Sequence, residues 1–329
     1  MGTGVAGGAG IGAGAEGAGG VGGRGGSAVG GAVGAGGVAG ATQASKLPSC
    51  QGLTAVCQGS DSDCCSVGLV KGGLFQRDNL LDAPYAATVS DFWLDTYEVT
   101  VGRFATFVAA YPGSRPSPGS GKNPKNPSDT GWNPEWDVML PPTQAALTAA
   151  VQCDESGGLM NTWTWGMGDT LPMNCVTWFE AFAFCVWDGG RLPTQLEANY
   201  AAAGGADQRF YPWSSPPASD TIDSSYAVYA NQTTNLSAPT FVGSTSPKGD
   251  GKFGHADLAG NVWEWVEDWY APLYPPGCVD CANLDPTQDR VVRGGSFYDD
   301  ATYLTSSSID TYDPTYRVNE IGFRCARDR

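Results

Sequence analysis

Ten cysteines constrain this 329-residue chain more than any other feature of its sequence. Six of them lie in two close groups, at positions 50, 57, 64 and 65 and at positions 278 and 281. Zinc sites usually combine cysteine with histidine or contain two CxxC pairs. This chain has one CxxC and a single histidine, His255. We therefore expect disulfide bonds formed in an oxidising compartment rather than a metal cluster.

The N-terminal part differs sharply from the rest. Residues 1–45 form a Gly/Ala tract, which cannot bury enough side chain to offset the entropy of ordering its backbone. We interpret it as a disordered linker, followed by a small cysteine-rich disulfide segment at 46–70 and a main domain at 71–329. No signal peptide is visible in residues 1–30, which lack a basic stretch followed by large apolar side chains. The cysteines nevertheless predict an extracytoplasmic protein, either secreted or tethered to a surface through the linker.

The charge of the chain excludes some classes of partner. A net charge of -16 argues against nucleic acid or an anionic membrane as the main partner, and it permits cation binding. No run of 18 apolar residues occurs, so we expect no membrane span. We expect a monomer.

Capping patterns predict three helices. Thr100 precedes an apolar face within residues 101–108, and Thr177 and Thr194 each have glutamate three residues later, which is the capping-box pattern. Short strands are expected at 90–100, 260–269, 290–295 and 321–327, and a loop at 111–143. This pattern predicts an α+β fold with much irregular structure, stabilised by disulfides and calcium.

Six stretches, taken together, resemble the formylglycine-generating enzyme family, also called the sulfatase-modifying factor domain. They are LDTYEVTVGRFATFV (94–108), MNCVTWFEAFAFCVWDGGRLPT (173–194), YPW (211–213), HADLAGNVWEWVEDW (255–269), RVVRGGSF (290–297) and IGFRCARD (321–328). The resemblance spans roughly residues 70–329. It implies a C-type-lectin-like fold with few regular elements around a twisted antiparallel sheet.

The resemblance also implies a calcium site in the segment that contains GNVWEW. Its ligands would be the Asp257 side chain, the carbonyl oxygens of Gly260 and Val262, and the Glu264 carboxylate. Such an all-oxygen set suits calcium. The alternative is that Asp257 caps a turn and Glu264 pairs with an arginine. A second calcium site of the family is degenerate here, because Asn231 matches one ligand but the following loop lacks the expected acidic residue.

One disulfide, Cys185–Cys325, is implied by the resemblance. Four of the other cysteines pair most simply as Cys153–Cys175 and Cys278–Cys281. Spacing does not fix the pairing of the N-terminal four, for which we expect the interleaved pairs Cys50–Cys64 and Cys57–Cys65.

The chain departs from the family where the resemblance implies oxidase chemistry. Two cysteines of the family's oxidases bind copper, and thiolates suit Cu(I). Asp299 and Leu304 occupy these positions here, beside Ser296 and Trp263, which line the family's pocket. Copper is therefore unlikely as a cofactor, and so is oxidase activity. The family's iron-dependent enzymes need a histidine cluster, whereas His255 is alone and is expected to be exposed.

The segment at 297–316 is rich in tyrosine and aspartate, which suits a binding surface. We predict that it binds a peptide, protein or glycan, as variable proteins of this superfamily use the same stretch. The alternatives are a solvated loop and an active oxidoreductase that modifies a protein side chain by an unusual mechanism. The candidate ligand-binding residues are Tyr298, Asp299, Asp300, Tyr303, Tyr312 and Tyr316.

In the segment 260–269, two carboxylates remain without a predicted role, Glu267 and Asp268. We expect Trp265 and Trp269 to lie in the core.

Overall fold

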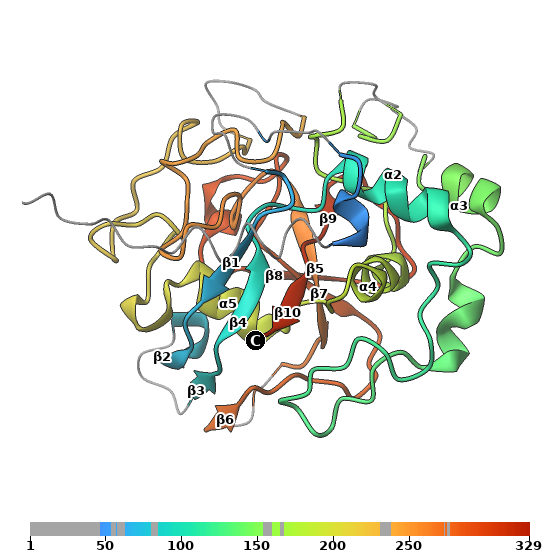
Figure 1. Ribbon diagram of the computed structural model, residues 1–329. Coiled ribbons are helices and arrows are strands. Elements are labelled where there is room, and N and C mark those ends of the chain that lie inside the picture. The colour runs from blue at the N-terminus through green and yellow to red at the C-terminus, as the bar shows by residue number, and fades with distance from the viewer. Residues whose placement is uncertain are drawn as a thin grey trace, which may run out of the picture. The chain divides into compact units, whose positions relative to one another are not determined.

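The computed structural model describes residues 47–53, 57, 63–79, 85–153, 160–164, 168–230, 238–272, 274 and 277–329 (Figure 1). All of these belong to one compact unit. The predicted linker at 1–45 and Asn231 lie outside the described residues. In the described part of the chain no helix is long and apolar enough to cross a membrane.

Local capping determines where the helices begin. The Thr100 side chain accepts a hydrogen bond from the Arg103 N–H, and both predicted capping boxes form, at Thr177 and at Thr194. All three predicted helix starts are therefore confirmed. The α-helices are α2 (Val101–Ala110), α3 (Gln144–Ala150), α4 (Trp178–Trp187) and α5 (Gln195–Ala202). The 3-10 helices are η1 (Pro48–Cys50), η2 (Arg77–Asn79), η3 (Pro134–Met139), η4 (Gly205–Asp207) and η5 (Ala301–Leu304).

The strands form three small sheets rather than the single antiparallel sheet that we expected. Their order is β1-β4-β10, β2-β3-β6 and β8-β7-β5-β9. Two of the pairings, β3 with β6 and β5 with β9, are parallel. The bounds are β1 (Val67–Val70), β2 (Gly73–Gln76), β3 (Ala86–Val89), β4 (Phe92–Asp95), β5 (Trp263–Trp269), β6 (Cys278–Val279), β7 (Arg290–Arg293), β8 (Ile309–Tyr312), β9 (Ile321–Gly322) and β10 (Ala326–Asp328). The predicted α+β class with much irregular structure is confirmed.

Strand β5 lies at the centre of the molecule, with α4 on one side and α5 on the other (Figure 1). Side chains of α2, α4 and β5 share the largest hydrophobic cluster, in which the rings of Phe104 and Phe184 stack 5.7 Å apart. Trp265 is fully buried there, and its indole N–H donates to the carbonyl oxygen of Val176. This packing holds the first half of β5, Trp263 to Trp265, in place.

The loop predicted at 111–143 contains a helical turn, η3, that the sequence analysis missed. Asn133 caps it by accepting a hydrogen bond from the Glu135 N–H, and Pro134 occupies its first turn. The turn places the Trp136 indole 5.2 Å from that of Trp178, at an angle of 89°.

All ten cysteines form disulfides. Three pairs have the expected partners, Cys185–Cys325, Cys153–Cys175 and Cys278–Cys281. The prediction for the N-terminal four was wrong, because Cys50 pairs with Cys65 and Cys57 pairs with Cys64. In this nested arrangement Cys50 lies at the end of η1, which packs against α2.

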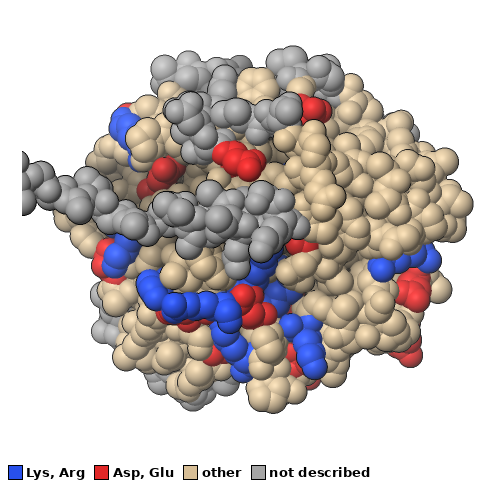
Figure 2. Space-filling model, viewed as in Figure 1, with Lys and Arg blue, Asp and Glu red and all other residues tan. Residues whose placement is uncertain are grey.

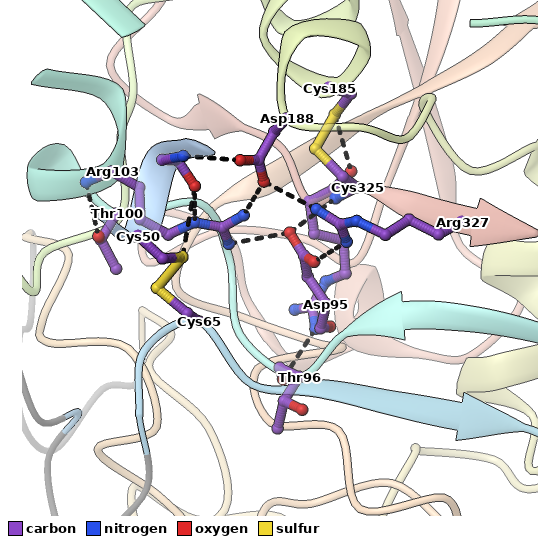
Figure 3. Close-up of polar contacts among 12 residues, drawn as sticks. Cys50, Cys65, Asp95, Thr96, Thr100, Arg103, Cys185, Asp188, Cys325 and Arg327 are labelled. Atoms are coloured by element: carbon purple, nitrogen blue, oxygen red, sulfur yellow. Dashed lines mark hydrogen bonds and ion pairs between the residues drawn. A yellow bond between two sulfur atoms is a disulfide. The ribbon is translucent and has the colours of Figure 1, made fainter. Parts of the chain in front are cut away.

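A buried ion network joins this cysteine-rich segment to the main domain (Figure 3). Arg103 donates to Asp95 at 2.9 Å and to Asp188 at 2.6 Å, and Arg327 pairs with the same two aspartates. The Ser49 N–H donates to Asp188 Oδ1 at 2.9 Å. Charges buried this deeply are tolerated because each one has an opposite partner and further hydrogen bonds.

The predicted boundary at residue 70 falls at the end of a strand that belongs to the main fold. Strand β1 pairs antiparallel with β4, which also pairs with β10. Residues 67–70 are thus part of a sheet with residues 326–328.

Candidate functional site

Residues 296–304 follow β7 and contain both positions at which the resemblance places redox cysteines. Leu304 lies at the end of η5 and is fully buried, in a cluster with Tyr211 and Trp213. Leucine has neither a metal-ligating nor a nucleophilic atom. The second cysteine position is therefore a packing position in this chain.

The first cysteine position, Asp299, closes a tight turn. Its Oδ2 accepts hydrogen bonds from the Ser296 hydroxyl at 2.6 Å and from the Ser296 N–H at 2.9 Å. Gly295 has a φ of +74°, and a Cβ there would lie 2.9 Å from the Tyr303 carbonyl oxygen, so the turn packs closely against η5. Ser296 and Trp263 are both buried. Ser296 and Asp299, at positions where the resemblance places the family's pocket, thus form a hydrogen-bonded turn.

The predicted ligand-binding tyrosines are divided between surface and core. Tyr298, Tyr303 and Tyr316 are exposed, at 68%, 47% and 56% of their surface, and Asp300 is also exposed. Tyr312 is half-buried on β8, where its ring lies 6.4 Å from that of Trp265 and its hydroxyl donates to Glu320. Burial and the neighbouring Glu320 raise the pKa of Tyr312. The exposed members are the ones available to a ligand.

At the start of β5 the structure pairs Glu264 with an arginine. The Arg324 guanidinium donates to both carboxylate oxygens, at 2.7 and 2.6 Å, and also to the carbonyl oxygens of Ala256 and Asp257. The Asp257 side chain accepts a hydrogen bond from the Gly243 N–H at 2.5 Å. An arginine partner for Glu264 is the expected alternative to calcium, and the arginine is Arg324, which lies in the GFRC motif next to Cys325.

A third carboxyl group, Glu98, lies beside these residues and was not predicted. It accepts hydrogen bonds from the Asn261 side chain at 2.6 Å and from the Val262 N–H at 3.2 Å. Burial, with repulsion from Asp257 and Glu264, raises the pKa of Glu98 well above its usual range. Burial also raises the pKa of Asp257 to about 6. Three acidic side chains therefore surround one arginine.

This excess of acidic groups fits the charge of a calcium ion. A carboxylate has about four lone-pair sites, so Glu264 can accept from Arg324 and still offer an oxygen to an ion. Among the described residues no group of three or more His, Cys, Asp or Glu side chains is placed to hold a metal. Two of the four predicted calcium ligands are backbone carbonyl oxygens, those of Gly260 and Val262.

His255 was expected to be exposed, and this was wrong. The ring is fully buried and lies against the backbone of Gly68 in β1, where a Cβ would be 2.7 Å from its Nε2. Burial lowers the pKa of His255 to about 4, so the ring is neutral at physiological pH. Its neighbours come from distant parts of the chain, which is why a local pattern gives no indication of its burial.

The last residues of β5, Glu267 to Trp269, have contacts and burial that differ from those expected from the sequence. Asp268, which had no predicted role, accepts hydrogen bonds from the N–H groups of Gln195 at 2.7 Å and Asn283 at 2.8 Å, and so fixes the start of α5. Trp269 was expected in the core but is only half-buried. Glu267 is 2% exposed.

The charges of the surface are mixed. On the face shown in Figure 2, Lys and Arg side chains lie next to Asp and Glu, over a largely uncharged surface. Among the described residues, Lys71 pairs with Asp91 and Lys252 pairs with Asp207. This face offers no broad basic surface for a polyanion.

Fold and site together define a disulfide-stapled α+β domain of the formylglycine-generating type. The model of the "Sulfatase-modifying factor enzyme 1-like domain" matches residues 56–329, and the chain belongs to that family. The match begins inside the predicted cysteine-rich segment.

Relatives of known name include active and inactive proteins. The chain is 30% identical over 171 residues to the formylglycine-generating enzyme of Thermomonospora curvata, covering 48% of this chain and 55% of that protein. It is 31% identical over 166 residues to the mouse "Inactive C-alpha-formylglycine-generating enzyme 2", covering 47% of this chain and 49% of that protein. The chain thus spans about half the length of the curated relatives that it matches.

Solved structures share the fold over most of the chain. PvdO from Pseudomonas aeruginosa has a TM-score of 0.55 at 20% identity, covering 80% of this chain and 94% of PvdO. The Treponema denticola variable protein 1 has a TM-score of 0.52 at 18% identity, covering 80% and 95%. At these identities the likeness concerns the fold alone.

Proposed function

We propose that this chain is an extracytoplasmic binding domain that keeps the fold of the formylglycine-generating family without its oxidase chemistry. One observation carries the proposal: Leu304 fills the second redox position as a buried core residue, while Asp299 at the first position is committed to a turn. All ten cysteines are in disulfides, so the protein offers no thiolate for copper. The mouse relative described as inactive is consistent with this proposal.

The ligand would be a peptide, protein or glycan, and it would contact the exposed side chains of the 298–316 segment. Tyr298 and Tyr303 project from the same short stretch, and Asp300 between them is exposed. Tyrosines provide rigid contact area at low entropic cost, and an adjacent carboxylate adds polar specificity. The Tyr303 ring packs edge to face against the buried Trp263 indole, with 6.5 Å between the ring centres.

Calcium binding through Asp257, Gly260, Val262 and Glu264 belongs to the same proposal. A cation would offset the repulsion among Glu98, Asp257 and Glu264, which Arg324 alone does not balance. The ion would stabilise the fold near the start of β5.

The oxidase alternative is tested with copper, oxygen and a Cys-x-Pro-x-Arg peptide. The proposal predicts an unchanged peptide mass, and a loss of mass that corresponds to aldehyde formation would disprove it. The Asp299→Cys/Leu304→Cys variant is assayed in parallel with the unmodified protein, because it introduces thiols at both family positions.

The binding surface is tested by selecting ligands from a random peptide library and a glycan array. We expect ligands that lose at least about tenfold in affinity for the Tyr298→Ser/Tyr303→Ser variant. Equal binding to the variant would move the ligand site away from these tyrosines. Phe210→Ser is the control, because Phe210 is an exposed aromatic residue outside the segment.

A further inference from the structure

A cavity of about 470 Å³ lies at the C-terminal end of β5, where Trp269 ends the strand. This volume is within the range of small-molecule sites. Its walls come from η3 and the loop before it, from α4, and from β5, β7 and the segment at 284–286. No residue of the 296–316 segment lines it. The cavity is therefore separate from the surface proposed above.

Three tryptophans form its walls. Trp136 and Trp178 meet edge to face, and Trp178 is fully buried, whereas Trp136 and Trp269 are half-buried. The exposed parts of the last two indoles offer flat apolar surface inside a concave site. Such surface suits a ligand that has a flat apolar face of its own.

The place that an organic cation would occupy between these rings is already filled. The Arg290 guanidinium carbon lies 3.6 Å from the ring centre of Trp178 and 3.8 Å from that of Trp269. Both distances are within the range of cation–π contacts. A second cation in the cavity would meet this guanidinium at short range, although the acidic side chains of Asp129, Glu135 and Asp285 also line the cavity.

Two buried polar atoms of the cavity residues lack partners. Glu267 Oε2 and Arg290 Nε form no hydrogen bond within the described parts of the chain, although both side chains are 2% exposed. Buried polar groups are normally hydrogen-bonded to protein or water, so each such atom needs an explanation. One is a donor, and the other belongs to a carboxyl group. A partner that both donates and accepts would satisfy the pair.

The carboxyl group of Glu267 is suited to a neutral partner. Burial, repulsion from Asp129 and a hydrogen bond with the Asp129 side chain raise the pKa of Glu267 well above its usual range, which favours the protonated form. A protonated carboxyl group both donates and accepts. Hydroxyl and amide side chains of Ser128, Thr130 and Asn133 also border the cavity.

We propose that this cavity binds a neutral saccharide, with the ring's apolar face against Trp136 and Trp269 and its hydroxyl groups hydrogen-bonded to Glu267 and Arg290. A sugar has both donors and acceptors, carries no charge to oppose Arg290, and presents an apolar face to an indole. These three properties match the tryptophan walls of the cavity, the positive charge of Arg290 and the two buried polar atoms that have no hydrogen-bond partner. The inference does not depend on the tyrosine surface.

The experiment uses the full chain and saturation-transfer NMR with methyl glycosides of glucose, galactose, mannose and N-acetylglucosamine and their trisaccharides. We expect at least one of them to bind with a Kd of about 1 mM or tighter. Trp269→Ala should weaken that binding about tenfold or more, and Phe210→Ala should leave it unchanged. Absence of saturation transfer to every sugar would overturn the proposal.

Glu267 variants test the polar part. Glu267→Gln keeps a donor and an acceptor and should retain binding, whereas Glu267→Leu should lose about tenfold. Each variant is first shown to be folded by its melting curve. Trp269→Phe keeps an aromatic ring, so it should bind the sugar more tightly than Trp269→Ala does. Equal sugar binding by Glu267→Leu and the unchanged protein would overturn the assignment.

Two further outcomes separate this proposal from the previous one. Sugar binding that is lost in Tyr298→Ser but not in Trp269→Ala would place the sugar on the tyrosine surface and refute the cavity. Binding of a trilysine peptide that is lost in Trp269→Ala, without any sugar binding, would identify the site as a cation site instead. Neither outcome bears on the oxidase test.

Discussion

Two glutamates three residues apart on β5 are both buried, yet their environments are opposite. Glu264 receives two hydrogen bonds from the Arg324 guanidinium. Glu267 receives none at Oε2 from the described residues, and its acidic neighbour Asp129 opposes its ionisation. Between Trp265 and Trp269 the register of β5 against β7 shifts, so the two glutamates lie on either side of the start of an irregular stretch of the strand. The two ends of one strand thus meet different partners.

This difference teaches how one fold accommodates buried acids. Burying an ionised carboxylate without a partner is very costly, so it must be paired or protonated. The Glu264 end uses an arginine and has acidic groups left over, which favours an added cation. The Glu267 end uses protonation beside a cavity, which favours a neutral hydrogen-bonding ligand.

The largest loss of stability is expected when the arginine that pairs with Glu264 is removed. Arg324→Ala leaves Glu264 buried without a counter-charge, and we expect a loss of about 3–5 kcal/mol in the free energy of unfolding. Urea denaturation measures it. The control is Arg329→Ala, which removes an arginine whose pairing with Asp91 is largely exposed, and should cost at most about 1 kcal/mol. A similar loss for both variants would contradict the role given to Arg324.

Calcium removal should affect the Glu264 end alone. We expect a chelator to lower the free energy of unfolding by about 2.7 kcal/mol relative to a calcium concentration of 100 times Kd. Thermal melting with and without chelator measures it. Glu264→Gln should abolish the chelator effect, and Glu267→Gln should preserve it. An unchanged melting curve in the unmodified protein would argue against calcium.

The pH dependence of stability should distinguish Glu267. Because its folded pKa is raised, its contribution to stability is full below the unfolded pKa and falls as pH rises toward the folded pKa. Glu267→Gln removes this loss, so the variant should gain stability relative to the unmodified protein as pH increases from about 4.3 upward. Melting temperatures across this range measure it. A difference between the two proteins that does not change with pH would contradict a protonated Glu267.

The smallest effect is expected at the cavity rim. Asp285 is exposed, so Asp285→Asn should change the free energy of unfolding by less than about 0.5 kcal/mol. The same urea experiment checks this. A larger loss would mean that the rim contributes to the fold, and that the division between buried and exposed acids is less sharp than the structure indicates.

Local signals in the sequence predicted the helix starts and the family. Thr177 and Thr194 form their capping boxes because the participating groups lie within one turn, where tertiary contacts are not needed. The motif around Cys325 similarly indicated its partner through the family resemblance. Positions 299 and 304 could be compared directly with the family because the GGS stretch that precedes them is retained.

The errors concern contacts between distant parts of the chain. Cys50 pairs with Cys65 rather than with its neighbour Cys64, a choice that cysteine spacing does not encode, and His255 is buried because β1 passes against it. The half-buried position of Trp269 and the cavity beside it depend on η3, which lies in a stretch expected to be loop. The Arg324–Glu264 pair joins residues 60 positions apart. None of these contacts has a local pattern that could reveal it.

The ion network around Asp95 has a consequence for the order of folding. Arg327, a partner of Asp95, lies 232 positions later in the chain. Cys185 can form its disulfide only after Cys325, 140 positions later, has been synthesised. The N-terminal strands therefore cannot complete their charge pairing or their third strand until residues 326–328 have been synthesised. Proteins dominated by such distant contacts fold slowly, because loop closure precedes the stabilising contacts. Nascent chains of this protein should consequently depend on chaperones and disulfide isomerases until β10 joins the sheet.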